Sequence, residues 1–117
     1  MRTTVGTLFE PGSDQLVDGR RAIFERIGQA AELEKGAITV EGHADSDRIK
    51  PTIAFPNNMA LSEARAKTVA EIIRSKLSDQ SRVKAIGLGD TVPLASNDSA
   101  AGKARNRRVE VVLDHGL

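Results

Sequence analysis

Three short stretches of this chain hold the side chains best suited to chemistry: residues 42–45 (GHAD), 58–66 (NMALSEARA) and 106–110 (NRRVE). The middle stretch has helical periodicity, which places Arg65 in the opening turn of a helix. A cation at that position opposes the positive end of the helix dipole and stabilises the helix least. A binding site for an anion would explain the placement, so we expect Arg65 to contact a negatively charged group.

Residues 43–47 (HADSD) also invite a metal or hydrolase interpretation, because imidazole and carboxylate groups serve as metal ligands and general bases. The sequence offers no cysteine, no H-E-x-x-H helix and no G-x-S-x-G elbow, and His115 lies in the C-terminal tail. We therefore expect no enzyme activity, no catalytic residue, no metal site and no cofactor. His43 is expected to end a strand, with its ring hydrogen-bonded.

The composition narrows the class of protein. With 117 residues the chain is expected to form one domain, residues 1–117 with a core over about 4–113. Its 17 basic and 16 acidic side chains give a net charge of +1, so no overall field attracts it to nucleic acid or to an anionic membrane. Three phenylalanines without tyrosine or tryptophan argue against stacking on bases or sugars. No apolar run is long enough to span a membrane.

Alternating strand and helix periods must position these stretches. They predict strands at 4–9, 37–41, 83–88 and 108–113 and helices at 16–33 and 62–77. Ser13 or Asp14 is expected to cap the first helix, and residues 93–103 are expected to be mostly loop, with one helical turn before Arg107. The loop from 45 to 58 is long enough to suggest a function. The apolar last strand is expected at a central position in the sheet.

The three motifs, read as G-H-x-D, N-x-x-L-S-x-x-R-A and N-R-R-V-E, resemble the peptidoglycan-binding domain of outer-membrane protein A (OmpA), Pal and MotB over about residues 36–113. Residues 55–58 (FPNN) resemble the F-P-S-N segment of MotB and of the C-terminal domain on some type VI secretion TssL proteins. Residues 97–108 (NDSAAGKARNRR) resemble the TssL type most closely. The resemblance implies an α+β fold, a two-layer sandwich of order β-α-β-α-β-β with a mixed sheet and both helices on one face.

The resemblance also implies a ligand, the peptidoglycan stem peptide, held by the ammonium and carboxylate of its diaminopimelate residue. Asp45 matches the aspartate that takes the ammonium, and Arg65 matches the arginine that takes the carboxylate, with help from the amides of the helix's first turn. Asn58 and Leu61 match positions that hold the loop and pack the cleft wall. Arg107 matches an arginine that orients the aspartate.

Simpler roles stand beside these. Ser62 is expected to be a helix cap rather than a ligand group, Asn58 a turn residue, and Arg107 with Arg108 a solvated basic patch. Ala44 replaces the family's usual threonine and removes a hydroxyl, and the long loop also departs from OmpA.

Two functions therefore stay open. One is a non-catalytic anchor that fixes a cell-envelope complex to peptidoglycan, and the other is an interaction scaffold of a secretion complex with a weakened cleft. Either implies a periplasmic domain whose partners are envelope proteins, not nucleic acid. Because relatives are tethered by a membrane segment or lipid outside this domain, Met1 is expected to begin a fragment of a longer, membrane-anchored protein.

Overall fold

A computed structural model of the chain describes residues 1–6, 8–10, 12–48, 51–52 and 55–114. Its strands are β1 (Arg2–Gly6), β2 (Ala37–His43), β3 (Val83–Gly89) and β4 (Arg108–Asp114). Its α-helices are α1 (Arg21–Glu32), α2 (Asn58–Arg74) and α3 (Ala100–Asn106), and a 3-10 turn, Gln80–Arg82, leads into β3. No helix in this part of the chain is long and apolar enough to cross a membrane.

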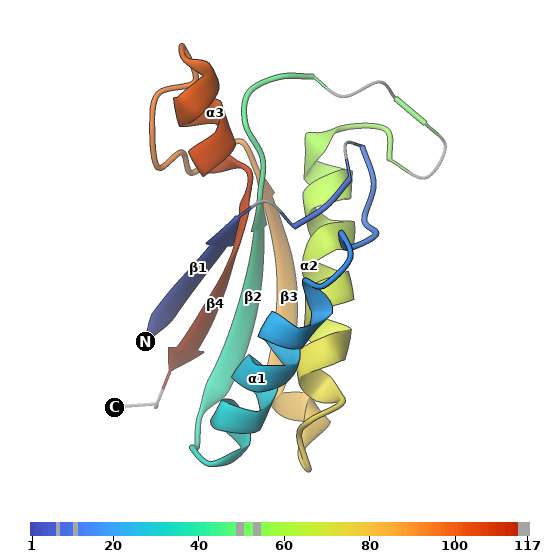
Figure 1. Cartoon of the computed structure of the whole chain (residues 1–117), viewed down its shortest axis with the longest axis vertical. Coiled ribbons are helices and arrows are strands. Elements are labelled where there is room, and N and C mark those ends of the chain that lie inside the picture. Colours follow the sequence, from blue (N-terminus) through green and yellow to red (C-terminus); the bar gives the residue numbers. More distant parts are fainter. Residues whose placement is uncertain (7, 11, 49–50, 53–54, 115–117) are drawn as a thin grey trace.

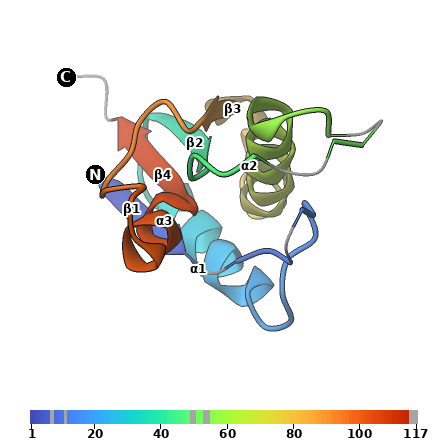
Figure 2. The ribbon, with the colours of Figure 1, turned by 90° about the horizontal axis from the view of Figure 1, so that it is seen from above.

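The strands form one mixed sheet in the order β1-β4-β2-β3. Strand β4 runs antiparallel to both β1 and β2, whereas β2 and β3 are parallel. The prediction that the last strand is central is thus confirmed. Helices α1 and α2 cover one face of the sheet, and α3 lies beyond its end (Figures 1 and 2). This is the predicted α+β architecture.

The core lies between the sheet and the two long helices. Every second residue of β2 and β4 points toward them, and those residues are the buried Ile38, Val40, Val109, Val111 and Leu113. The inner face of α2 supplies Ala66, Val69, Ala70 and Ile73. At Gly42 the helix rests directly on the strand, since a Cβ there would lie only 2.0 Å from the carbonyl oxygen of Ser62.

Two elements near the N-terminus differ from the prediction. The first strand spans Arg2–Gly6 rather than residues 4–9, and Phe9 instead forms an isolated bridge with Leu16. The first helix starts at Arg21 rather than residue 16, because Gly19 has a φ of 83° and turns the chain out of helical conformation. Ser13 and Asp14 are therefore not its caps.

The predicted start of the second helix was also wrong. Helix α2 begins at Asn58, because the side chain of Asn57 accepts a hydrogen bond from the Ala60 amide at 2.9 Å and caps the helix one turn earlier. Arg65 consequently lies about two turns into the helix, so its predicted conflict with the helix dipole does not exist. Ser62 is no cap either. Its buried hydroxyl donates to the Met59 carbonyl oxygen and accepts from the Gly89 amide.

The segment before the last strand contains more helix than predicted. Helix α3 spans Ala100–Asn106, and the Ser99 side chain accepts from the Gly102 amide at 3.0 Å. The described residues between β2 and α2 form neither helix nor strand, as predicted, and residues 49–50 and 53–54 of that loop lie outside the described part of the chain.

Candidate functional site

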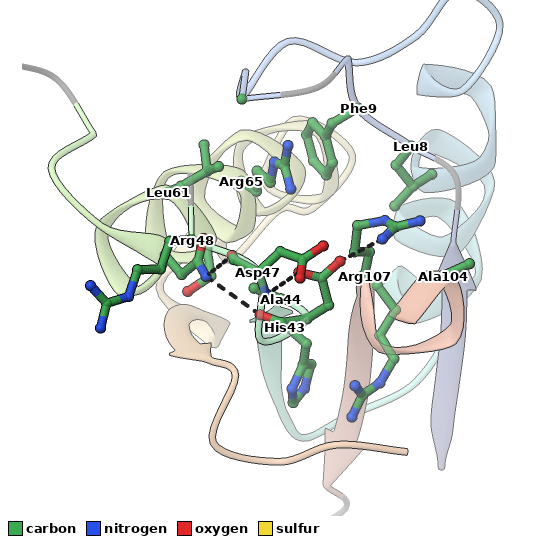
Figure 3. Close-up of a pocket in the computed structure, with 15 residues that line it drawn as sticks. Leu8, Phe9, His43, Ala44, Asp47, Arg48, Leu61, Arg65, Ala104 and Arg107 are labelled. Carbon is green, nitrogen blue, oxygen red and sulfur yellow. Dashed lines mark hydrogen bonds and ion pairs between the residues drawn. The ribbon is translucent and has the colours of Figure 1, made fainter. Parts of the chain in front are cut away.

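A cleft of about 420 Å³ opens where β2 ends, between α2, α3 and the segment before α1 (Figure 3). The residues matched to the three sequence motifs come from the loop after β2, from α2 and from the residue that joins α3 to β4. All of them line this cleft: Asp45, Asn58, Leu61, Arg65 and Arg107. The fold therefore brings together groups that lie far apart in the sequence.

Asp45 is the anion of the cleft. It is 6% exposed, and its Oδ1 accepts the amide of Asp47 at 2.9 Å. Its Oδ2 accepts Arg107 Nη1 at 2.5 Å, so Arg107 contacts the carboxylate as the motif predicted (Figure 3). A carboxylate offers about four lone-pair sites, and these two bonds leave room for a further donor from a ligand.

Asn58 and Leu61 build the wall beside Asp45. The Asn58 side-chain amide donates to the carbonyl oxygens of Asp45 at 3.4 Å and of Asp47 at 2.7 Å, which ties the loop to the first residue of α2. Asn58 thus acts on the loop rather than as a turn residue. Leu61 is 3% exposed and lines the cleft.

A second tie to this loop was not predicted. Asn97 Oδ1 accepts the Ser46 amide at 3.2 Å and the side-chain amide of the buried Asn106 at 2.9 Å. Asn97 opens the residue 97–108 run that the sequence already singled out, but spacing alone does not reveal which backbone group it reaches.

Arg65 is the cation on the opposite side of the cleft. Its Nε donates to the Ser13 carbonyl oxygen at 2.8 Å and its Nη2 to that of Glu10 at 3.2 Å. Its Cζ lies 5.0 Å from the centre of the Phe9 ring. Burial, and then the charge of Arg107, lower the pKa of Arg65 below its ordinary value, although the negative charges of Asp14 and Asp45 act in the opposite direction. The guanidinium stays charged at neutral pH. Sequence reasoning missed this contribution from the segment before α1.

A buried charge cluster lies beneath the cleft. His43 ends β2, as predicted, but neither ring nitrogen has a hydrogen-bond partner among the described residues. Its Nε2 lies 3.3 Å from Glu110 Oε2 and 3.5 Å from Glu41 Oε1, and this group could hold a metal ion, because its ligand atoms lie within 4.8 Å of one another. Arg2 and Arg108 already neutralise both carboxylates, which disfavours adding a divalent cation.

The arrangement presents a carboxylate and a guanidinium on opposite sides of one open cleft. Such a pair can bind a zwitterion, because the carboxylate meets an ammonium and the planar guanidinium meets a carboxylate. The cleft has a histidine, but among the described residues no serine, threonine or lysine is hydrogen-bonded to its ring.

Known proteins resemble this chain in sequence and in structure. The model of the OmpA family matches residues 8–107. The peptidoglycan-binding protein ArfA of Mycobacterium tuberculosis is 35% identical over 97 residues, covering 80% of this chain and 28% of ArfA. The cell wall anchor of the type VI secretion system from Pseudomonas aeruginosa superposes with a TM-score of 0.88 at 38% identity, covering 97% of this chain and 80% of the anchor.

A MotB-like protein from Desulfovibrio vulgaris is also similar in structure. Its TM-score is 0.88 at 28% identity, over 99% of this chain and 74% of that protein. The curated relatives are longer, and this chain spans 35 to 47% of the first of them. The resemblance to the OmpA, MotB and type VI secretion domains is thereby confirmed.

Proposed function

This chain belongs to the OmpA family, and from that premise we propose that it is a non-catalytic module that binds peptidoglycan and anchors a cell-envelope complex to the cell wall. The observation that carries the proposal is the pairing of Asp45 and Arg65 in one cleft. The name of ArfA and the description of the secretion-system anchor support it. The domain would act in the periplasm, as part of a longer protein tethered to a membrane.

We further propose that the cleft recognises the diaminopimelate residue of the stem peptide. Its free end carries an ammonium and a carboxylate, and the ammonium would join Arg107 on the carboxylate of Asp45 while the carboxylate takes the open edge of Arg65. Lysine in the same position of the stem lacks that carboxylate. Discrimination between diaminopimelate-type and lysine-type peptidoglycan then depends on Arg65, because only the diaminopimelate carboxylate can pair with its guanidinium.

Co-sedimentation tests this proposal. The protein should sediment with diaminopimelate-type peptidoglycan and remain in solution with lysine-type material. Asp45→Asn and Arg65→Gln should each lose at least about 2 kcal/mol of binding, roughly a thirtyfold rise in Kd, because each removes one side of a charge pair that the ligand completes.

Matched controls lie on the exposed face of α2. Glu63→Gln and Lys67→Gln change the same charges on exposed side chains outside the cleft and should bind like the natural sequence. Chromatography of the supernatant should find no soluble fragments, since anchoring requires no turnover. Equal retention on both polymers contradicts diaminopimelate recognition. No retention on either contradicts the anchor and supports the interaction scaffold.

A further inference from the structure

The segment before α1 forms one wall of the cleft, and both its ends are fixed. Leu8 is 3% exposed within the core, and its carbonyl oxygen accepts the Val17 amide at 2.7 Å. Phe9 pairs with Leu16 in the antiparallel bridge. On the other side, the Thr68 hydroxyl of α2 donates to the Asp14 carbonyl oxygen at 3.1 Å. The segment is therefore attached to the core and to α2 independently of Arg65.

Arg65 lies against this segment in a defined orientation. Its Nε and Nη2 donate to the carbonyl oxygens of Ser13 and Glu10, and the Phe9 ring stands beside the guanidinium (Figure 3). The Nη1 group has no hydrogen-bond partner among the described residues. One edge of the guanidinium plane is thus occupied by the backbone, while another remains available to a ligand in the cleft.

We propose that Phe9 is a positioning residue, whose ring and neighbouring carbonyl groups hold Arg65 ready for an anionic ligand group. An arginine side chain loses considerable rotational freedom when it binds, and a site that has already ordered it avoids that cost at the moment of binding. An aromatic face attracts the guanidinium, whereas an aliphatic side chain of similar size only packs against it. The inference rests on the proposed function in taking Arg65 as the group that binds a carboxylate.

A measurement without ligand tests the positioning itself. Hydrogen exchange of the Arg65 Nε–H, followed by NMR, should be slow in the natural sequence compared with that of Arg21, whose side chain is 62% exposed. Phe9→Leu should accelerate the Arg65 exchange, and Phe9→Tyr, which keeps the ring, should not. Exchange of Arg65 as fast as that of Arg21, or unchanged in Phe9→Leu, overturns the proposal. If Phe9→Leu fails to fold, exchange of Arg65 as fast as that of Arg21 in the natural sequence still overturns the proposal, and exchange in Phe9→Tyr that is as slow as in the natural sequence still supports it.

Binding of a soluble stem peptide that ends in meso-diaminopimelate gives the second readout. Phe9→Leu should weaken binding roughly three- to tenfold, and Phe9→Tyr should restore it. In an Arg65→Gln background, which has no cation beside the ring, Phe9→Leu should cause no further loss. An equal loss in both backgrounds assigns Phe9 a general structural role and overturns the proposal. If no variant binds the peptide, the proposed function fails, while the exchange measurement still decides the positioning.

Discussion

His43 lies among two arginines and two glutamates that already pair with one another, so protonation of its ring would add a positive charge to a balanced set. Arg108 lies beside it on β4, Glu110 on β4 and Glu41 on β2 face its ring, and Arg2 of β1 bridges the two glutamates at 2.7 and 2.9 Å. Burial, and then the charge of Arg108, lower the pKa of His43 below its ordinary 6.5 despite the nearby carboxylates. The folded protein therefore holds His43 neutral where the unfolded chain already binds a proton.

Stability should fall when the pH drops below about 6.5. The unfolded chain then binds more protons than the folded one, and a single group of this kind changes the free energy of unfolding by at most about 1.4 kcal/mol per pH unit. Burial opposes ionisation of Glu110, but hydrogen bonds from Arg2 and Arg108 outweigh it and lower its pKa from 4.5. Glu110 therefore adds a second loss only below about pH 4.5.

Urea unfolding at pH 7.5 and pH 5.5 measures the effect of His43. The urea concentration at the midpoint of unfolding should differ less between the two pH values for His43→Gln than for the natural sequence. This expectation does not depend on how stable His43→Gln is at pH 7.5. His115→Gln serves as the control for the second histidine. If the natural protein and His43→Gln lose equal stability on acidification, His43 does not cause the loss.

At the scale of elements, the cleft depends on how closely α2 approaches the sheet. Gly42 and Gly87 face the start of this helix, and Gly42→Ala would bring a Cβ to 2.0 Å from backbone of Ser62. Because a helix backbone cannot yield locally, α2 must shift away from β2. We expect a loss of about 1–3 kcal/mol in the free energy of unfolding, together with weaker peptidoglycan binding, since Asn58, Leu61 and Arg65 all move with the helix.

Gly6→Ala is the matched control, because it adds the same methyl group to another strand. Its Cβ would lie 3.7 Å from the Arg107 carbonyl oxygen, an ordinary contact. Urea unfolding and co-sedimentation of both variants measure the two effects. A Gly42→Ala protein that is as stable as Gly6→Ala would show that α2 accommodates the methyl group.

The strands and the order of the elements were predictable because their signals are local. Alternation marks residues 37–41, and the apolar content of residues 108–113 indicates a central strand. The start of α2 was missed because two polar residues, Asn57 and Ser62, both suit a cap. Which of the two residues caps the helix depended on the Gly89 amide of β3, which donates a hydrogen bond to the Ser62 hydroxyl. Sequence periodicity does not reveal that contact.

In the candidate site, too, some features were predictable from the sequence and others were not. Asp45, Asn58, Leu61, Arg65 and Arg107 were found from motifs, and all line the cleft. Arg65 donates to the backbone carbonyl oxygens of Glu10 and Ser13. Every residue type carries such a group, so no pattern of side chains predicts these contacts. Glu41, His43 and Glu110 meet only because β2 and β4 are paired in the register that sets Glu41 opposite Glu110.

At the scale of the whole molecule, the net charge is only +1, although the cleft is lined by many charged side chains. Its lining includes Asp45, Asp47, Arg48, Arg65 and Arg107. Attraction of a zwitterion is therefore local, and raising the salt from 0.15 to 1 M shortens the screening length from about 8 Å to about 3 Å. We expect peptidoglycan binding to weaken over this range.

Co-sedimentation across the salt series measures this dependence. Asp45→Asn should show a shallower dependence than the natural sequence, because one charged contact is gone. Urea unfolding at each salt concentration serves as the control for loss of the fold. Binding that is constant from 0.15 to 1 M salt would indicate that apolar contacts, rather than the charges of Asp45 and Arg65, hold the polymer.

The position of β1 has a mechanical consequence. Its first residues lie at the end of the sheet away from α3, and the strand runs toward the cleft end beside the antiparallel β4 (Figure 1). A pull on Met1 against a ligand held in the cleft would run along β1, across hydrogen bonds that stand perpendicular to it. Such a load shears all the bonds of the pair at once instead of unzipping them one by one. Because rupture under force is governed by the barrier to unfolding, this strand arrangement suits the domain to carry tension from one end of the sheet to the other.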